Sequence, residues 1–129
     1  MITNFGIFDR VKYLGYVPIG DLAILFNLAV LAFFPTRHEN FCFPIVEAMS
    51  CGTPVVASKV YSIPEVVGNS AILCNPNDVQ SFTSAIEKVM EEEWLREKMK
   101  KDGLENSKRF SWKKCATETI KIYKNVLNK

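Results

Sequence analysis

The sequence of 129 residues has one histidine, no Cys-x-x-Cys pair and no apolar run close to the roughly 20 residues that a membrane-spanning helix needs. Its cysteines are too few and too scattered for a disulfide framework or a zinc site; they are Cys42, Cys51, Cys74 and Cys115. Asp9 and Arg10 interrupt the apolar residues at the start, where a signal peptide would need a continuous apolar stretch. We therefore expect reduced thiols, no bound metal and a cytoplasmic location.

The charge of the chain is nearly balanced, with a formal net charge of +2. This value does not favour a strongly basic nucleic-acid binder, so we expect no nucleic acid partner. Hydrophobic residues make up 48% of the sequence, which is enough for a folded core and argues against disorder. The length predicts one domain covering residues 1–129.

Short apolar segments alternate with helical patterns along the first two thirds of the chain. The predicted strands are residues 11–15, 30–34, 55–57 and 71–74. Alternation with short links is typical of parallel strands joined by right-handed helical crossovers. The predicted fold class is therefore α/β, a three-layer, Rossmann-like parallel sheet of about four strands with helices on both faces.

Helices accumulate after the last predicted strand. Asn77 or Asp78 is positioned to cap the first of them, and Ser111 the last. The last helix carries an apolar stripe formed by Trp112, Cys115, Ala116, Ile120, Tyr123, Val126 and Leu127. The simplest interpretation of this stripe is a face packed in the core.

Two acidic residues flank a proline between the second and third predicted strands. Glu39 lies in the loop, Pro44 stands where a helix could begin, and Glu47 falls one turn inside that helix. Ligands of open α/β sheets bind beyond the carboxyl ends of the strands, where we expect both carboxylates. A carboxylate can accept hydrogen bonds from two vicinal hydroxyl groups, and the first amides of a helix attract phosphate. Residues 36–58 therefore predict a site for a small polar ligand.

The order of these segments resembles the donor-binding lobe of retaining GT-B glycosyltransferases, of the group 1 or family 4 type. The resemblance covers residues from about 10 to 127, and its blocks are residues 14–18, 21–22, 29–36, 39–58, 64–68, 75–78 and 110–112. The family signature is a pair of glutamates separated by seven residues, which corresponds here to Glu39 and Glu47. The chain would then be the C-terminal part of the donor lobe, in one half of a GT-B enzyme.

The resemblance implies roles for the residues around the two glutamates. Glu47 would accept hydrogen bonds from the ribose hydroxyls of a nucleotide-diphosphate sugar, and Glu39, the implied catalytic residue, would lie beside the transferred sugar. The implied donor-binding residues are Glu39, Asn40, Phe41, Cys42, Phe43, Ile45 and Glu47. The backbone amides around Phe41, Cys42, Phe43 and Ile45 would face the diphosphate. The resemblance also implies a metal-independent reaction without a cofactor, in which the nucleotide sugar is the substrate.

The sequence departs from the family pattern directly after the first glutamate. The family usually has Gly-Phe-Gly there, whereas this chain has Asn40-Phe41-Cys42. Glycine adopts a positive φ without cost, Asn40 tolerates that region fairly well, and Cys42 does so less readily. We expect the same binding mode with an altered donor affinity.

A larger departure concerns parts of the family that have no counterpart here. The Gly-rich turn with an Arg and a Lys for the diphosphate is not found before Val11, and neither is the acceptor lobe with its catalytic histidine. The resemblance thus implies a hexosyltransferase in which this chain captures the donor and is inactive alone. Its implied partners are the nucleotide-sugar donor, the N-terminal acceptor lobe and, as a further candidate, a membrane-associated acceptor.

One alternative function stays open at this point. The chain could be a free-standing, non-catalytic domain for nucleotide binding or assembly. In the GT-B fold the final helix reaches across to the other lobe. Without that lobe, its apolar stripe would be exposed or would mediate self-association.

Overall fold

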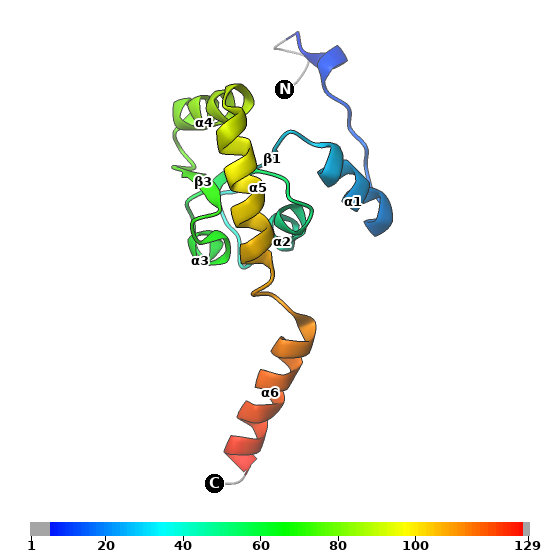
Figure 1. The fold of residues 1–129 in the computed structure, drawn as a ribbon, viewed down its shortest axis with the longest axis vertical. Helices are drawn as coiled ribbons and strands as arrows, with labels where there is room; N and C mark the ends of the chain where they lie inside the picture. The colour runs from blue at the N-terminus through cyan, green and yellow to red at the C-terminus, as the bar shows by residue number, and fades with distance from the viewer. Residues whose placement is uncertain (1–5, 128–129) are drawn as a thin grey trace.

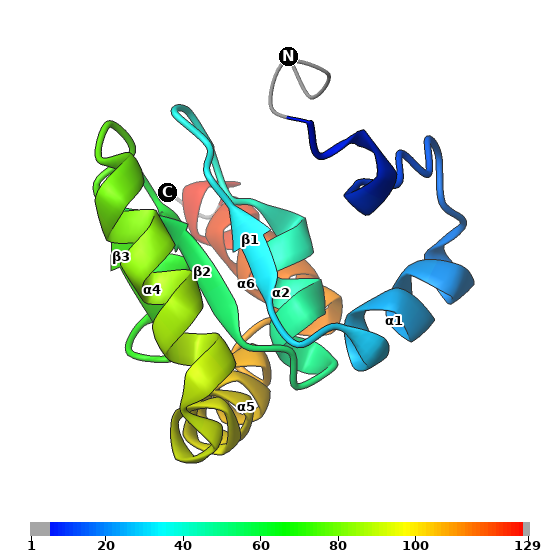
Figure 2. The same ribbon diagram turned by 90° about the horizontal axis from the view of Figure 1, so that it is seen from above.

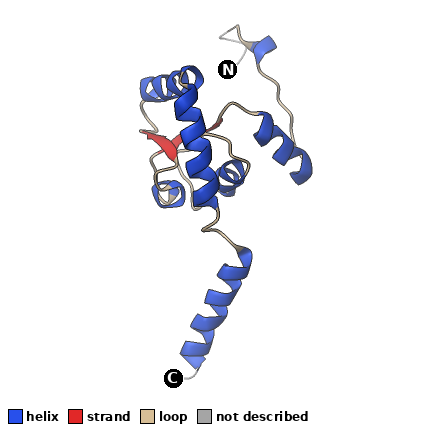
Figure 3. Cartoon of the chain, in the orientation of Figure 1, coloured by secondary structure: helices blue, strands red, loops and turns tan. Residues whose placement is uncertain are grey.

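Three parallel strands lie between layers of helices in the computed structural model, which describes residues 6–127 (Figures 1 and 2). The elements, in chain order, are η2 (Phe8–Arg10), α1 (Ile19–Leu28), β1 (Ala32–Phe34), α2 (Phe43–Ser50), β2 (Val55–Ser58), α3 (Ile63–Val67), β3 (Ala71–Cys74), α4 (Val79–Glu91), α5 (Glu93–Ser107) and α6 (Trp112–Leu127). Figure 3 shows that helices dominate and that the strands are short. The predicted α/β class is confirmed.

The strands are ordered β1-β2-β3 and are parallel throughout. Phe33 of β1 lies opposite Val56 of β2, which in turn lies opposite Ile72 of β3. The four residues of β2 are fully buried, as expected for a central strand covered on both faces. β1 lies at one edge of the sheet, and within residues 6–127 β2 is the strand that pairs with it.

Helices cover both faces of this sheet, as the sequence predicted. α2 and α4 lie on opposite sides of the sheet (Figure 2). Val55 and Ala57 belong to a core built with α2 and α3, whereas Val56 belongs to a second core built with α4. The alternation follows from the two-residue period of a strand. α5 packs against both α2 and α4.

The expectation of about four strands is wrong, because the sheet formed by residues 6–127 has three strands. Residues 11–15, predicted to be the first strand, form no strand and are exposed, with Tyr13 94% exposed. α1 packs against α2, and within the described residues β2 is the strand paired with β1, so residues 11–15 do not extend the sheet. An extended segment becomes a strand only where a neighbouring strand pairs with it.

The interpretation of the last helix as core is also wrong. α6 projects away from the rest of the chain, and none of its described residues is buried (Figure 1). The apolar stripe of this helix is therefore open to solvent. No helix within residues 6–127 combines the length and the apolar character needed to cross a membrane.

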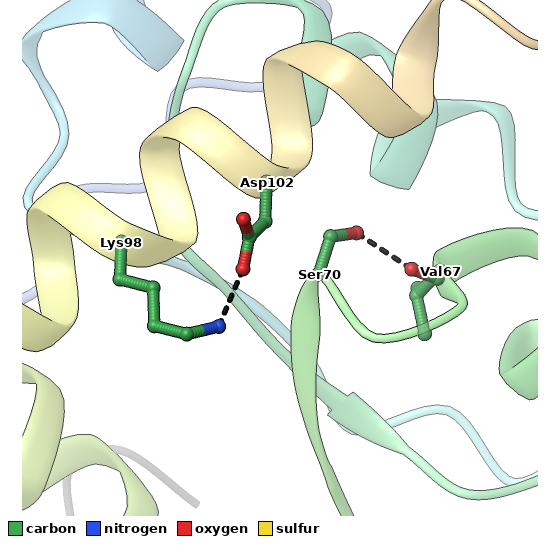
Figure 4. Close-up of polar contacts among 4 residues, drawn as sticks. All are labelled: Val67, Ser70, Lys98 and Asp102. Carbon is green, nitrogen blue, oxygen red and sulfur yellow. Dashed lines mark hydrogen bonds and ion pairs between the residues drawn. The ribbon is translucent and has the colours of Figure 1, made fainter.

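Local capping interactions define several helix ends. The Asp78 carboxylate accepts a 3.1 Å hydrogen bond from the Ser81 amide, and Gly68 ends α3 at a φ of 54°. Figure 4 shows the Ser70 hydroxyl donating to the Val67 carbonyl at 2.6 Å. The same view shows the ion pair of Lys98 and Asp102, 2.6 Å apart across one turn of α5.

Candidate functional site

The carboxyl ends of β1 and β2 open into two loops that contact each other. The hydroxyl of Ser62, at the start of α3, donates to the backbone carbonyl of Asn40. Beside this bond, the ring of His38 lies 4.5 Å from the ring of Tyr61, between centroids, with an edge-to-face geometry. Tyr61 has a φ of 45°, a value that non-glycine residues rarely adopt. The loop after β1 is therefore supported by the loop after β2.

Glu39 and Asn40 are linked at the tip of the first loop. The Asn40 amide donates a 3.1 Å hydrogen bond to Oε1 of the half-buried Glu39. Asn40 does not take the positive φ that its residue type would tolerate. The second carboxylate oxygen of Glu39 is not used in this bond and can accept from a ligand.

Cys42 ends the loop and begins α2 as its N-cap residue. Its φ is 62° and its ψ is 68°, which places its backbone in the left-handed region that glycine adopts most readily. Its side chain is only 6% exposed. The carbonyl of Cys42 accepts a 3.0 Å hydrogen bond from the Ile45 amide, which closes the first turn of the helix.

The thiol of Cys42 lies within electrostatic reach of both glutamates. Burial raises the pKa of this thiol to about 11, and the negative charge of Glu39 and then that of Glu47 add to the increase. The two acids lie eight positions apart in the sequence, and the charge of each acts on this thiol, that of Glu39 more strongly than that of Glu47. The thiol at the start of α2 is therefore buried and neutral, with Glu39 in the preceding loop and Glu47 one turn into the helix.

The residues of α2 divide between the site and the core. The helix starts at Phe43, one residue before the predicted start at Pro44, so that Glu47 is its fifth residue rather than its fourth. Glu47 is half-buried, whereas the side chain of Ile45 is fully buried among core residues. Of the seven residues predicted for the site, Ile45 could therefore act only through its backbone, and its amide is bonded to Cys42.

Phe41 and Phe43 precede and follow Cys42 in the sequence, and their rings contact each other. Their centroids lie 4.9 Å apart. Phe41 is half-buried against the core, and Phe43 is 52% exposed. Within residues 6–127 no hydrogen-bond acceptor is found for the amides of Phe41 and Cys42. These amides, together with the positive end of the α2 dipole, can stabilise a negatively charged group.

Two buried hydroxyls at the same edge of the sheet were not predicted as site residues. The side-chain oxygens of Thr36, after β1, and Ser58, at the end of β2, are buried and have no hydrogen-bond partner within the described residues. Their position directly after apolar strands is the signal that could have singled them out. No three His, Cys, Asp or Glu side chains in residues 6–127 are grouped as ligands for a metal ion.

Comparison with known proteins shows which family the sequence matches. The sequence model of the family described as "Glycosyl transferases group 1" matches residues 1–106. O-antigen chain mannosyltransferase B of Escherichia coli is 45% identical over 114 residues, which is 88% of this chain and 30% of that protein. MMP alpha-(1->4)-mannosyltransferase of Mycolicibacterium hassiacum is 32% identical over 131 residues, covering 98% of this chain and 32% of that protein.

A solved structure has the same fold. The sucrose-phosphate synthase of Thermosynechococcus elongatus superimposes with a TM-score of 0.91 at 26% identity, over 98% of this chain and 33% of that one. The chain thus spans about a third of the length of each of these three relatives.

Proposed function

The chain belongs to the group 1 glycosyl transferases, and we propose that it forms the donor-binding part of a retaining hexosyltransferase with the Rossmann-like GT-B fold. Its ligand is a nucleotide-diphosphate sugar, which it holds at the start of α2. The observation that carries this proposal is the start of α2, where the amides of Phe41 and Cys42 have no acceptor within the described residues, the half-buried Glu39 lies in the same loop, and the half-buried Glu47 follows one turn into the helix. Two acceptors and a set of helix amides at one edge of a parallel sheet suit a ligand that combines hydroxyls with phosphates.

Each residue has a distinct part in this proposal. Glu47 accepts hydrogen bonds from the ribose hydroxyls, and Glu39 lies beside the transferred sugar, where it orients the sugar hydroxyls. The amides of Phe41, Cys42 and Phe43 and the dipole of α2 stabilise the charge that builds on the diphosphate as it leaves. This mode of capture uses no metal ion, because backbone donors meet the phosphate charge.

We infer that the 129-residue chain captures the donor without transferring the sugar. In this family the active site lies between two lobes, and the match covers about a third of each relative's length. Transfer would then require an acceptor lobe to hold the second substrate. Incubation of the purified chain with nucleotide sugars and simple sugar acceptors should give no transfer product, and a measurable product would overturn this inference.

Calorimetric titration with UDP, GDP and ADP tests donor capture. One of these nucleotides should bind, and Glu47→Gln should weaken its binding by about 10- to 100-fold, since hydrogen bonds to a charged group contribute about 1.5–3 kcal/mol. Glu39→Gln should weaken the binding of the matching nucleotide sugar more than it weakens the binding of the nucleotide alone. Glu87→Gln, at an exposed position of α4, is the control and should change neither affinity. Equal binding by the wild type and Glu47→Gln would contradict the proposal.

The exposed face of α6 favours a second candidate function, that of an assembly module. Ile120, Tyr123 and Val126 are exposed on a helix that buries none of its described residues. Light scattering across a concentration series should show a rising mass if this face joins two copies, and Ile120→Lys should abolish the rise. A constant monomer mass would remove this function and leave donor capture unaffected.

A further inference from the structure

Four aromatic rings form a continuous row between the site and the start of α6. Trp112 stacks on Phe43 with their ring centroids 5.6 Å apart and an interplanar angle of 22°. Phe43 lies 4.9 Å from Phe41, and Phe41 meets Phe110 edge-to-face at 5.5 Å. We call Phe41, Phe43, Phe110 and Trp112 the aromatic row. It links the two residues that flank Cys42 to the two residues that flank Ser111.

The two ends of the aromatic row differ in burial. Phe41 and Phe110 pack against the core of α2, α3 and the sheet. Phe43 is 52% exposed and Trp112 is 76% exposed, so this end of the row lies at the surface. The guanidinium of Arg109 lies 5.4 Å from the Phe110 ring and covers part of the buried end. The row therefore fixes a surface residue of α2 to the core by ring contacts.

The Trp112 ring makes little contribution to the folded core. Trp112 is the first residue of α6, and none of the described residues of that helix is buried. Its contact is with Phe43, the residue directly after Cys42 and the first residue of α2. Because Cys42 is held at a positive φ, which a non-glycine residue does not prefer, contacts on both of its neighbours help to hold it there.

We propose that Trp112 is a positioning residue for the donor loop, residues 39–43. By stacking on Phe43 it keeps the amides of Cys42 and Phe43 and the carboxylate of Glu39 in one arrangement. The consequence for ligand binding depends on the proposed function. An aromatic pair contributes enough to change a binding constant by about 2- to 10-fold, which is the loss of nucleotide affinity expected for Trp112→Ala. Trp112→Phe keeps a ring in place and should retain most of the affinity.

Hydrogen exchange of the ligand-free protein tests the positioning role without reference to any nucleotide. Trp112→Ala should speed exchange of the amides of Asn40 and Ile45, which are hydrogen-bonded to the Glu39 carboxylate and the Cys42 carbonyl, while the thermal midpoint stays close to that of the wild type. Trp112→Phe should restore slow exchange. Trp94→Ala is the matched control, because Trp94 is exposed and lies at the opposite end of α5 from α6. Exchange at Asn40 and Ile45 that is the same in Trp112→Ala and the wild type would overturn the proposal.

Tryptophan fluorescence gives a second readout. The chain has two tryptophans, so that Trp94→Phe leaves Trp112 as the sole emitter. Addition of the nucleotide that binds in calorimetry should shift the Trp112 emission along the same binding curve. Binding without a shift, and with unchanged affinity in Trp112→Ala, would refute the positioning role and leave donor capture intact. If none of UDP, GDP and ADP binds, donor capture fails, and the exchange result alone decides the role of Trp112.

Discussion

Burial and, after it, the carboxylate of Glu39 raise the pKa of the Cys42 thiol from its ordinary value of 9.0 to about 11. The two residues are joined by the short loop that leads into α2. A thiol with this pKa is neutral at physiological pH and is a poor nucleophile. Cys42 therefore contributes a neutral sulfur atom to a site whose side chains carry two negative charges.

The pKa of Cys42 predicts how its alkylation depends on pH. The rate of reaction with iodoacetamide should rise with a midpoint near pH 11, because the thiolate is the reactive form. Glu39→Gln removes a charge that raises the pKa, so its midpoint should lie lower. Mass spectrometry of the modified peptides measures both midpoints, with the exposed Cys115 as internal reference. A wild-type midpoint near pH 9 would contradict this assignment.

The same shift predicts a loss of stability in alkali. The folded state keeps the Cys42 proton up to about pH 11, whereas the unfolded chain loses it near pH 9. Above pH 9 the unfolded state binds fewer protons, so the contribution of Cys42 is complete below pH 9 and is lost as the pH rises to 11. Urea unfolding across this range should show a steeper fall for the wild type than for Cys42→Ala. Parallel curves for the two proteins would refute the prediction.

The positive φ of Cys42 predicts opposite tolerance for two substitutions. Cys42→Gly relieves a backbone cost of about 1–2 kcal/mol but loses the buried thiol and adds chain entropy, so its stability should stay within about 1 kcal/mol of the wild type. Cys42→Val places a β-branched residue at this φ and should cost about 2 kcal/mol or more.

Cys74→Val is the matched control for this pair, since Cys74 is a buried cysteine with the extended backbone of a strand. In urea unfolding, Cys74→Val should lower the free energy of unfolding less than Cys42→Val does.

Cys42→Gly should also change nucleotide affinity, because the Cβ and sulfur atoms at the helix start limit how closely a phosphate can approach. The same nucleotide affinity for the wild type and Cys42→Gly would show that Cys42 does not tune donor binding.

Two glycines that face other elements predict opposite effects of the same substitution. A Cβ at Gly103, inside α5, would meet Met49 at ordinary contact distances of 3.5–3.6 Å. Gly103→Ala should therefore stabilise the protein by about 0.5–1 kcal/mol through lower chain entropy. A Cβ at Gly52 would lie 3.1 Å from Lys100 at a φ of 74°, so Gly52→Ala should cost about 1–2 kcal/mol. Urea unfolding of both variants checks the signs.

Elements set by local interactions could be predicted from the sequence. Asp78 caps α4 as the sequence predicted, and α3 has a proline near its start and a glycine at its end, the residue types that favour these positions. These features depend on residues a few positions apart, whose conformational preferences are strong. The apolar runs at 55–57 and 71–74 also became strands, because helices cover them on both faces.

Features set by distant contacts could not be predicted in the same way. Residues 11–15 have the composition of a strand, but pairing depends on which strand lies beside them in space. The apolar stripe of α6 indicates that this face packs against another surface. Periodicity alone cannot show whether that surface belongs to the same chain. At the site, the sequence singled out Glu39 and Glu47, whereas the positive φ of Tyr61 and the buried hydroxyl of Ser58 depend on the surrounding fold.

The edge position of β1 has a consequence for handling the protein. Within the described residues β1 pairs on one side only, with β2. Phe33 in this strand is partly exposed, and Val30 just before it is exposed as well. A free, apolar strand edge is a template for pairing with another chain, which is the first step of aggregation. Concentrated or warmed samples should therefore form β-rich precipitates through this edge, and a lysine in place of Val30 should slow their growth.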